Sequence, residues 1–338
     1  MISFCVKKRI TIAALAIFLS MADASWAIRL KIATLSPDGS MWMEKMRAGA
    51  KEVAEKTQSR VTFKFYPGGV MGNDNAVLRK IRIGQLHGGA VIGGSLSRFF
   101  PGNQIYALPM KFSTLEEVDY VRQFIDPFVT DGIEKAGFVN FGLIGGGFSY
   151  IMSQNPINTV ADLKSQKIWL PDNERINEGA ISAFNITPTT LPLSDVRTGL
   201  QSGLINTVAT SPVGAVVLQW HTQINYVTDV PLIYFHGMLV IAKKAFSKIS
   251  QADQKIVRTI MTRASMEIDR QNRLDNIKAI DALKKRGITF ISPDSASREE
   301  WLATGRKASQ VMVQAGLLPK EKIDELDRHL QTFHDDSR

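Results

Sequence analysis

The feature that most constrains the fold is an uninterrupted helical stretch near the carboxyl end of the chain. From Ser250 to Arg286 the sequence contains neither proline nor glycine, and Gly287 then provides a natural helix stop. Ser250 is a favourable N-cap residue. A helix of about 36 residues is more than about 50 Å long at 1.5 Å per residue, longer than one small domain is wide. We therefore expect it to span two compact lobes.

The first third of the chain predicts one α/β lobe. Extended segments with alternating or buried patterns are separated by segments in which apolar residues recur at helical spacing. This alternation is typical of a parallel sheet covered by helices. The expected strands are 29–34, 61–65 and 86–92, and the expected helices are 41–56 and 75–83.

In the middle of the chain the regular alternation of strands and helices stops, and a second α/β unit is then predicted. We expect an extended segment at 106–109, a helix at 115–128, a strand at 138–143 that ends in Gly145–Gly147, and an extended run at 150–153. Further strands are expected at 167–170, 188–191 and 204–209, with helices at 176–184 and 195–202. Strands within 230–241 would return to the first lobe, and the tail adds a strand at 289–291 and two helices.

These elements predict two α/β lobes that are crossed twice by the chain and braced by the long helix. A chain of 338 residues is long enough for two such bodies. Lobe 1 is expected to comprise 28–149 and about 238–268, and lobe 2 to comprise 150–237 and about 269–318. Residues 319–338 would form a C-terminal helix and tail.

The first 27 residues have the pattern of a cleaved signal peptide. A cationic start at Lys7, Lys8 and Arg9 precedes a short apolar run at 10–19, and Ser25-Trp26-Ala27 offers small residues for cleavage. The apolar run of about ten residues is too short to cross a bilayer. The sequence therefore predicts export to the periplasm, with the mature chain starting at Ile28.

The mature chain has no cysteine, because the single one, Cys5, lies in the predicted signal. Removing the signal's three cations and one anion lowers the formal net charge from +9 to +7. The cations are interspersed with carboxylates along helices, and no aromatic-interleaved basic stripe predicts nucleic-acid binding. The balance favours a solvated surface, an anionic solute or a membrane face. We expect a monomer.

The sequence offers no catalytic constellation, so we expect a protein that is not an enzyme and has no cofactor or metal. None of the five histidines is four residues from another, and no HExxH motif is present. The glycine runs 88–94 and 145–147 lack the spacing of nucleotide loops, and 147–151 lacks the last glycine of a GxSxG elbow. Close backbone approach or a hinge is the better interpretation of both glycine runs.

Several segments, in order and spacing, resemble the DctP-type solute-binding subunits of TRAP transporters, the tripartite ATP-independent periplasmic carriers. The resemblance covers about residues 29–330. It rests on KIAT at 31–34, YPGGVMG at 66–72, IGQLHG at 83–88, YALP at 106–109, NTVADLKSQKIWLP at 158–171, and PLSDV at 192–196 with LQSGLIN at 200–206.

The resemblance implies an α/β, two-lobe clamp like a type II periplasmic binding protein. Such a protein closes on a small organic solute, typically an organic acid, and hands it to a small and a large integral membrane subunit. Two other functions stay open: a periplasmic ligand sensor that docks onto a receptor kinase, and an exported hydrolase.

The sequence departs from the family at the residues expected to hold a solute carboxylate. Family members often carry an arginine where this chain has Trp169, and a second basic residue where it has Phe148. In one interpretation the solute is less charged or more apolar and lies among aromatic rings: Trp169, Phe148, Trp42, Tyr150 and Trp220. In the other, Arg175 or Arg98 binds the carboxylate. Asn206, Thr210 and Ser211 could hydrogen-bond the solute or serve a turn.

Overall fold

The computed structural model describes residues 27–171 and 183–336. The predicted signal peptide and most of the helix predicted at 176–184 therefore lie outside the described residues. The first half of the chain forms β1 (Ile28–Thr34), α2 (Met41–Lys56), β2 (Val61–Tyr66), α3 (Asp74–Arg82), β3 (Gly88–Ile92), the 3₁₀ turns η1 (Gly93–Leu96) and η2 (Pro101–Ala107), α4 (Leu115–Lys135), β4 (Phe138–Asn140) and β5 (Ile144–Ser153).

The second half begins with short elements and ends with long ones. The short elements are α5 (Val160–Lys164), β6 (Trp169–Pro171), β7 (Thr189–Leu191), η3 (Leu193–Asp195), α7 (Val196–Ser202), β8 (Thr207–Thr210), α8 (Pro212–Val217) and η4 (Trp220–Thr222). They are followed by β9 (Tyr226–Ala242), α9 (Lys243–Phe246), α10 (Gln251–Lys285), β10 (Thr289–Ile291), α11 (Ser295–Gln314) and α12 (Lys320–Asp336).

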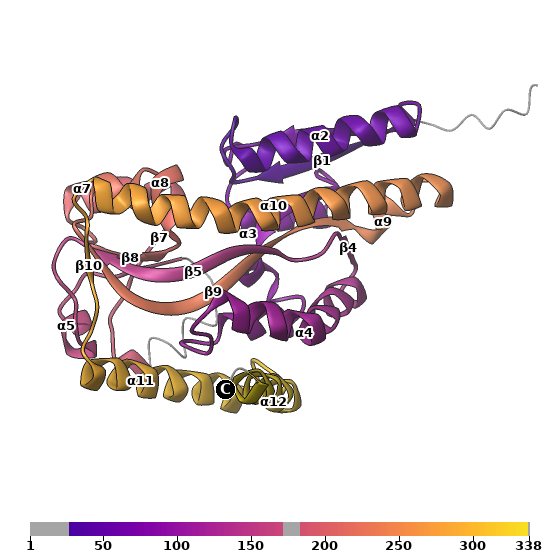
Figure 1. The fold of residues 1–338 in the computed structure, drawn as a ribbon. Coiled ribbons are helices and arrows are strands. Elements are labelled where there is room, and N and C mark those ends of the chain that lie inside the picture. Colours follow the sequence, from indigo (N-terminus) through magenta and orange to yellow (C-terminus); the bar gives the residue numbers. More distant parts are fainter. Residues whose placement is uncertain (1–26, 172–182, 337–338) are drawn as a thin grey trace, which may run out of the picture.

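The long helix is confirmed as α10. Its N-cap is Ser250, whose side chain accepts a hydrogen bond from the Asp253 amide. Near its start Val257 packs in a core shared with α2, and near its end Leu283 packs in a separate core around Trp220. Figure 1 shows α10 running from beside α2 to beside α7 and α8. One helix therefore contributes to the cores of both lobes, which confirms the two-lobe α/β architecture.

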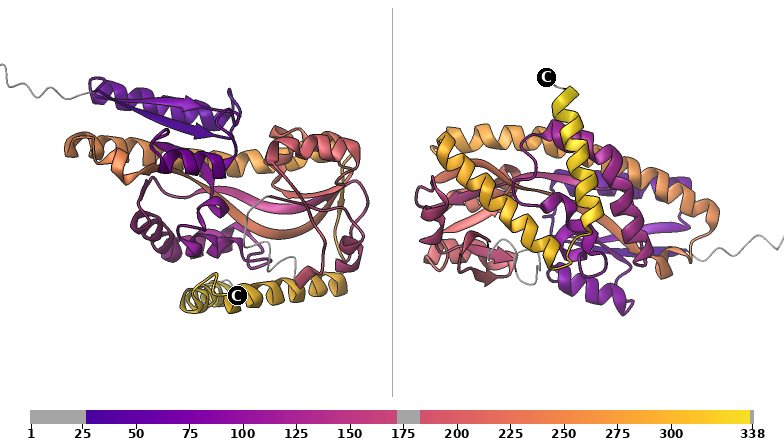
Figure 2. Two further views of the ribbon diagram at one scale, coloured as in Figure 1. Left: turned by 180° about the vertical axis from the view of Figure 1, so that it is seen from behind. Right: turned by 90° about the horizontal axis from the view of Figure 1, so that it is seen from below.

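The first lobe begins with the predicted parallel strands. β1 pairs in parallel with β2 on one side and β3 on the other. The sheet then continues with antiparallel partners in the order β2-β1-β3-β9-β5-β8, while β4 and β10 also pair with β9. Figure 2 shows from behind and below that α11 and α12 lie on the side of the molecule away from α10.

The strand β9 replaces several short strands that the sequence predicts. The return segment expected within 230–241 is a single strand, β9, of 17 residues. It tolerates Pro231 because the pairing with β5 is interrupted there: Ser149 faces Ile233, but Ile151 faces Thr228. Proline is acceptable in a strand at such an irregularity, where its nitrogen has no ladder bond to make.

Three further predictions are wrong in detail. The strand expected at 138–143 ends at Asn140, and the strand β5 runs through Gly145–Gly147 instead of stopping there. Tertiary pairing with β9 outweighs the low strand preference of glycine. The segment expected to be extended at 106–109 instead contains the end of the 3₁₀ turn η2, where Tyr106 is buried. The lobe boundaries stay a prediction.

Candidate functional site

A cleft of about 250 Å³ lies where β5 and β9 cross between the lobes. Its walls come from the first turn of α4 with the residues before it, from β5, from the start of α8 and from the second half of α10. Binding sites for small molecules are commonly concave, mostly apolar and furnished with a few polar groups. Its lining fits that description, with Phe148, Tyr150, Ile277 and Ile280 beside Arg273.

Phe148 and Tyr150, both predicted as solute contacts, line this cleft. Both lie on β5, two residues apart, so their side chains leave the same face of the strand. Phe148 is buried and packs edge-to-face on Tyr234, with ring centroids 5.7 Å apart. Tyr150 is half-buried; burial, followed by the charge of Asp229, raises the pKa of its phenol. It offers the cleft a neutral hydroxyl.

Trp169 and Trp220 lie together in the core of the second lobe. Their rings meet edge-to-face at 5.2 Å, and both residues are at most 5% exposed. The indole N–H of Trp169 donates to the Leu191 carbonyl at 2.9 Å. Its hydrogen-bond donor is therefore satisfied within the protein, and Tyr150 packs against the same core cluster.

The three polar candidates that follow Ile205 belong to local structure around β8 and α8. The Asn206 side chain accepts from the Lys167 amide at 2.9 Å. Ser211 is the N-cap of α8, and its hydroxyl accepts from the Gly214 amide. Thr210 pairs with Tyr150 across the β5–β8 ladder. Thr210 therefore lies beside β5, Asn206 and Ser211 serve turns or caps, and none of the three is among the residues that line the cleft.

Two further candidates, Trp42 and Arg98, lie apart from this group. Trp42 is half-buried on α2 and packs against the core that α2 shares with α10. Arg98 is exposed, with its guanidinium 4.8 Å from the centre of the Phe99 ring. Burial and the charges of Arg79 and Arg82 lower the pKa of Arg98. Arg175 lies outside the described residues.

Arg273 is a cation in the cleft that sequence reasoning missed. It projects from α10, its side chain is 25% exposed, and it forms a two-pronged ion pair with Asp119 of α4. Hydrogen bonding to Asp119 raises the pKa of Arg273 against the opposing effect of burial. The i, i+4 spacing of Asp269 and Arg273 on the predicted helix is a signal that could have identified it.

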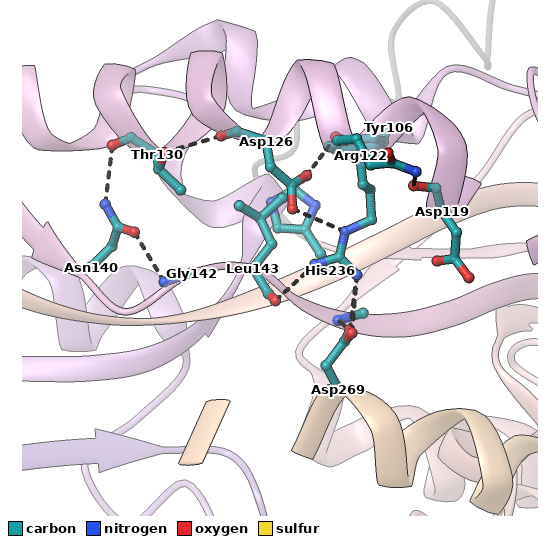
Figure 3. A network of polar contacts seen from close by, with 12 residues as sticks. Tyr106, Asp119, Arg122, Asp126, Thr130, Asn140, Gly142, Leu143, His236 and Asp269 are labelled. Carbon is teal, nitrogen blue, oxygen red and sulfur yellow. Dashed lines mark hydrogen bonds and ion pairs between the residues drawn. The ribbon is translucent and has the colours of Figure 1, made fainter. Parts of the chain in front are cut away.

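A partly buried polar network adjoins the cleft (Figure 3). Arg122 on α4 donates to Asp126 at 3.0 Å, to Asp269 of α10 at 3.0 and 3.2 Å, and to the Leu143 carbonyl at 3.1 Å. Burial opposes the charge on Arg122, but Asp126, Tyr234 and Asp269 raise its pKa overall. Two carboxylates thus hold one partly buried guanidinium where α4, β5 and α10 meet.

His236 lies on β9 behind this network. Its Nε2 is 3.0 Å from the Asn103 side-chain oxygen, so that nitrogen donates its proton. Burial, followed by the charge of Arg122, lowers the pKa of His236 to about 3. The imidazole is therefore neutral and serves as a structural hydrogen-bond donor.

Neither a metal cluster nor a membrane-spanning helix is found in the part of the chain that the structure describes. Over residues 27–171 and 183–336, no three histidine, cysteine or acidic side chains gather as a metal site would require. Over the same residues, no helix combines the length and the apolar character needed to cross a bilayer.

Comparison with known proteins gives a consistent result. Residues 32–315 match the family model described as bacterial extracellular solute-binding protein, family 7. A solute-binding protein of Roseobacter denitrificans is 24% identical over 296 residues, which cover 86% of this chain and 90% of that protein.

Two solved structures share the fold. A TRAP periplasmic solute-binding protein from Desulfovibrio salexigens, with bound orotic acid, is similar with a TM-score of 0.80 at 18% identity, covering 90% of this chain and 99% of that one. Another from Xanthobacter autotrophicus, with bound β-D-galacturonate, has a TM-score of 0.81 at 17% identity, with the same coverage.

Proposed function

The chain belongs to family 7 of the bacterial extracellular solute-binding proteins, and on that premise we propose that it captures an organic acid in the periplasm for a TRAP transporter. The family match over residues 32–315 is the observation that carries the proposal. The architecture supports it, because β5, β9 and α10 join two lobes that each have their own cores.

The proposed solute is a small carboxylate. Two proteins of the same fold hold orotic acid and β-D-galacturonate, both of which carry a carboxyl group. The partners would be the solute and the small and large membrane subunits of the transporter. The predicted signal peptide supports a periplasmic location, and the matched proteins are solute receptors, which supports binding without catalysis.

We propose that aromatic rings contribute much of the contact with the solute. Phe148 and Tyr150 line the cleft, and Tyr150 packs against the cluster that holds Trp169 and Trp220. An aromatic surface supplies apolar area and, at Tyr150, a hydroxyl. Arg98 and Arg175 remain the alternative for the carboxylate, joined by Arg273 of the cleft.

Thermal denaturation in the presence of candidate solutes tests the function. A solute bound only by the folded protein stabilises it through mass action, by about 2.7 kcal/mol when its concentration is a hundred times its Kd. The midpoint temperature of unfolding therefore rises. The panel comprises orotate, galacturonate, dicarboxylates, keto acids, aromatic acids and uncharged polyols. At least one acid should stabilise the protein and the polyols should not. A panel without any stabiliser would argue against the proposal.

Substitutions then distinguish the two binding modes. Phe148→Leu and Tyr150→Phe should weaken binding of the identified acid if the rings hold it, and Trp169→Phe should do so if that indole shapes the site. Phe65→Leu on β2, which lies away from the cleft, is the matched control. Unchanged affinity in all three variants, with loss in Arg98→Gln or Arg273→Gln, would favour a cation over the rings.

A further inference from the structure

Over its glycine segment, one edge of β5 has no strand neighbour among the residues that the structure describes. β9 pairs with β5 on one side from Ile144 onward, but β8 pairs with the other side only from Tyr150. The amide and carbonyl groups on that second edge need partners when they are buried. Side chains of α10 supply them.

Three residues of α10 bond to this edge. The Gly145 amide donates to Asp269 at 2.6 Å, and Asn272 donates to the Gly145 carbonyl at 2.9 Å. Asn276 donates to the Gly146 carbonyl at 3.1 Å. Residues 269, 272 and 276 are three and four positions apart, so they share one face of the helix. They replace the ladder of a missing strand.

The glycines allow the helix and the strand to approach this closely. A Cβ atom on Gly145 would lie 2.9 Å from an oxygen of the Asp269 carboxylate, and one on Gly147 would lie 2.8 Å from the Asn276 amide nitrogen. Gly147 also has a φ of +92°, which residues with a side chain rarely adopt. The glycine run singled out in the sequence is therefore the docking point for α10.

The two ends of this contact are anchored to different lobes. At one end, Asp269 is held by Arg122 of α4, which belongs to the predicted lobe 1. At the other end, Asn276 accepts a hydrogen bond of 3.2 Å from the Val213 amide in the first turn of α8, which belongs to the predicted lobe 2. Asn276 thus connects α10, β5 and α8 through one amide group.

We propose that Asn276 is a positioning residue that sets the angle between the lobes before solute arrives. Its amide fixes α8 and the edge of β5 relative to α10, so moving lobe 2 about the glycine segment must break or rearrange these bonds. The inference rests on the proposed function only in taking the lobes to move. The population of interlobe arrangements, and through it the apparent affinity for solute, would depend on this side chain.

The test measures the distance between the lobes in the absence of solute. Spin labels are attached through Lys51→Cys on α2 and Lys164→Cys on α5, both exposed, in the chain from Ile28 onward, which has no cysteine of its own. Asn276→Leu should broaden or shift the distance distribution. The expected change is about five- to tenfold in the ratio of populations, as expected for the loss of one or two ordinary hydrogen bonds.

Gln271→Leu is the matched control on the same helix. Gln271 donates to Asp275 of α10. Among the described residues, no hydrogen bond joins its side chain to β5 or α8, so Gln271→Leu removes a similar amide without touching either element. If Asn276→Leu fails to fold, Asn276→Asp takes its place, because it keeps an acceptor for Val213 and loses the donor to Gly146. Distributions that match the wild type, or an equal change in Gln271→Leu, would overturn the proposal.

This experiment is independent of the solute screen. Because it uses solute-free protein, a positive result stands even if no acid in the panel binds. Conversely, an unchanged distance distribution would refute the role of Asn276 without affecting the proposed capture of an organic acid.

Discussion

At the scale of single residues, the guanidinium of Arg122 has the most demanding environment near the cleft. Its side chain is 13% exposed, and it satisfies Asp126 and Asp269 together. Removing one partner of a buried ion pair leaves uncompensated charge, which costs more than the pair itself contributes. Here the two acids would also be left facing each other across the space that the guanidinium fills.

Arg122→Leu should therefore lower the free energy of unfolding by about 3 kcal/mol, measured by urea denaturation at neutral pH. Arg306→Leu is the comparison, because the Arg306–Glu299 pair is more than 60% exposed on both sides. An exposed pair contributes about 0–1 kcal/mol. Similar losses in the two variants would show that burial of the Arg122 network is energetically unimportant.

His236 predicts a pH dependence of stability. Its pKa is about 3 in the folded protein against 6.5 for an ordinary histidine, so below about pH 6.5 the unfolded chain gains a proton that the folded one excludes. This contribution to stability is complete above about pH 6.5 and is lost as the pH falls toward 3, by about 1.4 kcal/mol per pH unit.

His236→Gln should remove that part of the slope. Urea unfolding at a series of pH values from about 8 down to about 5 gives the free energies for both proteins, and their difference should shrink as the pH falls. If the substitution also lowers the free energy of unfolding by the same amount at every pH, the change of the difference with pH is unaffected. Parallel curves would mean that the folded protein takes up a proton on this imidazole as readily as the unfolded chain does, so that burial does not lower its pKa.

At the scale of elements, α10 depends on its first turn for a defined start. Ser250 accepts from the Asp253 amide at 3.1 Å, and Asp253 is itself held by Arg60 through two bonds. An N-cap serine satisfies an amide that has no partner inside the helix, and replacing it by alanine costs about 1 kcal/mol.

Ser250→Ala should lower the free energy of unfolding by about that amount and speed hydrogen exchange in the first turn of α10. Ser247→Ala is the control, since the exposed Ser247 hydroxyl donates to the Lys244 carbonyl and caps no helix amide among the described residues. A loss of stability confined to the control would contradict the assignment of Ser250 as the cap.

At the scale of the whole molecule, two lobes joined by β5, β9 and α10 should change their relative position when solute binds. A solute held between lobes favours the closed arrangement by its difference in affinity for the two states. X-ray scattering in solution should show a smaller radius of gyration with the acid found by the thermal screen. A rigid shape that no compound alters would argue against a clamp.

Local patterns in the sequence were sufficient for several of the long helices, although α4 (Leu115–Lys135) continues past its predicted end at 128 and the short helices α5, α8 and α9 were not predicted. The bounds of α2 at 41–56 and the start of α10 after Ser250 follow from caps, apolar spacing and the absence of proline and glycine. The family resemblance rests on short motifs, and the family model matches residues 32–315, which contain most of them. Such signals lie within a few turns of chain, where local chemistry decides.

Only the tertiary structure decided the course of β5 and β9, the environment of Trp169 and the presence of Arg273 in the cleft. β5 continues through glycines because β9 and α10 hold both of its edges. Trp169 is buried because Trp220, more than 50 positions away, packs on it. These outcomes depend on contacts between segments distant in sequence, and burial and pairing energies of that kind have no signature within a local window.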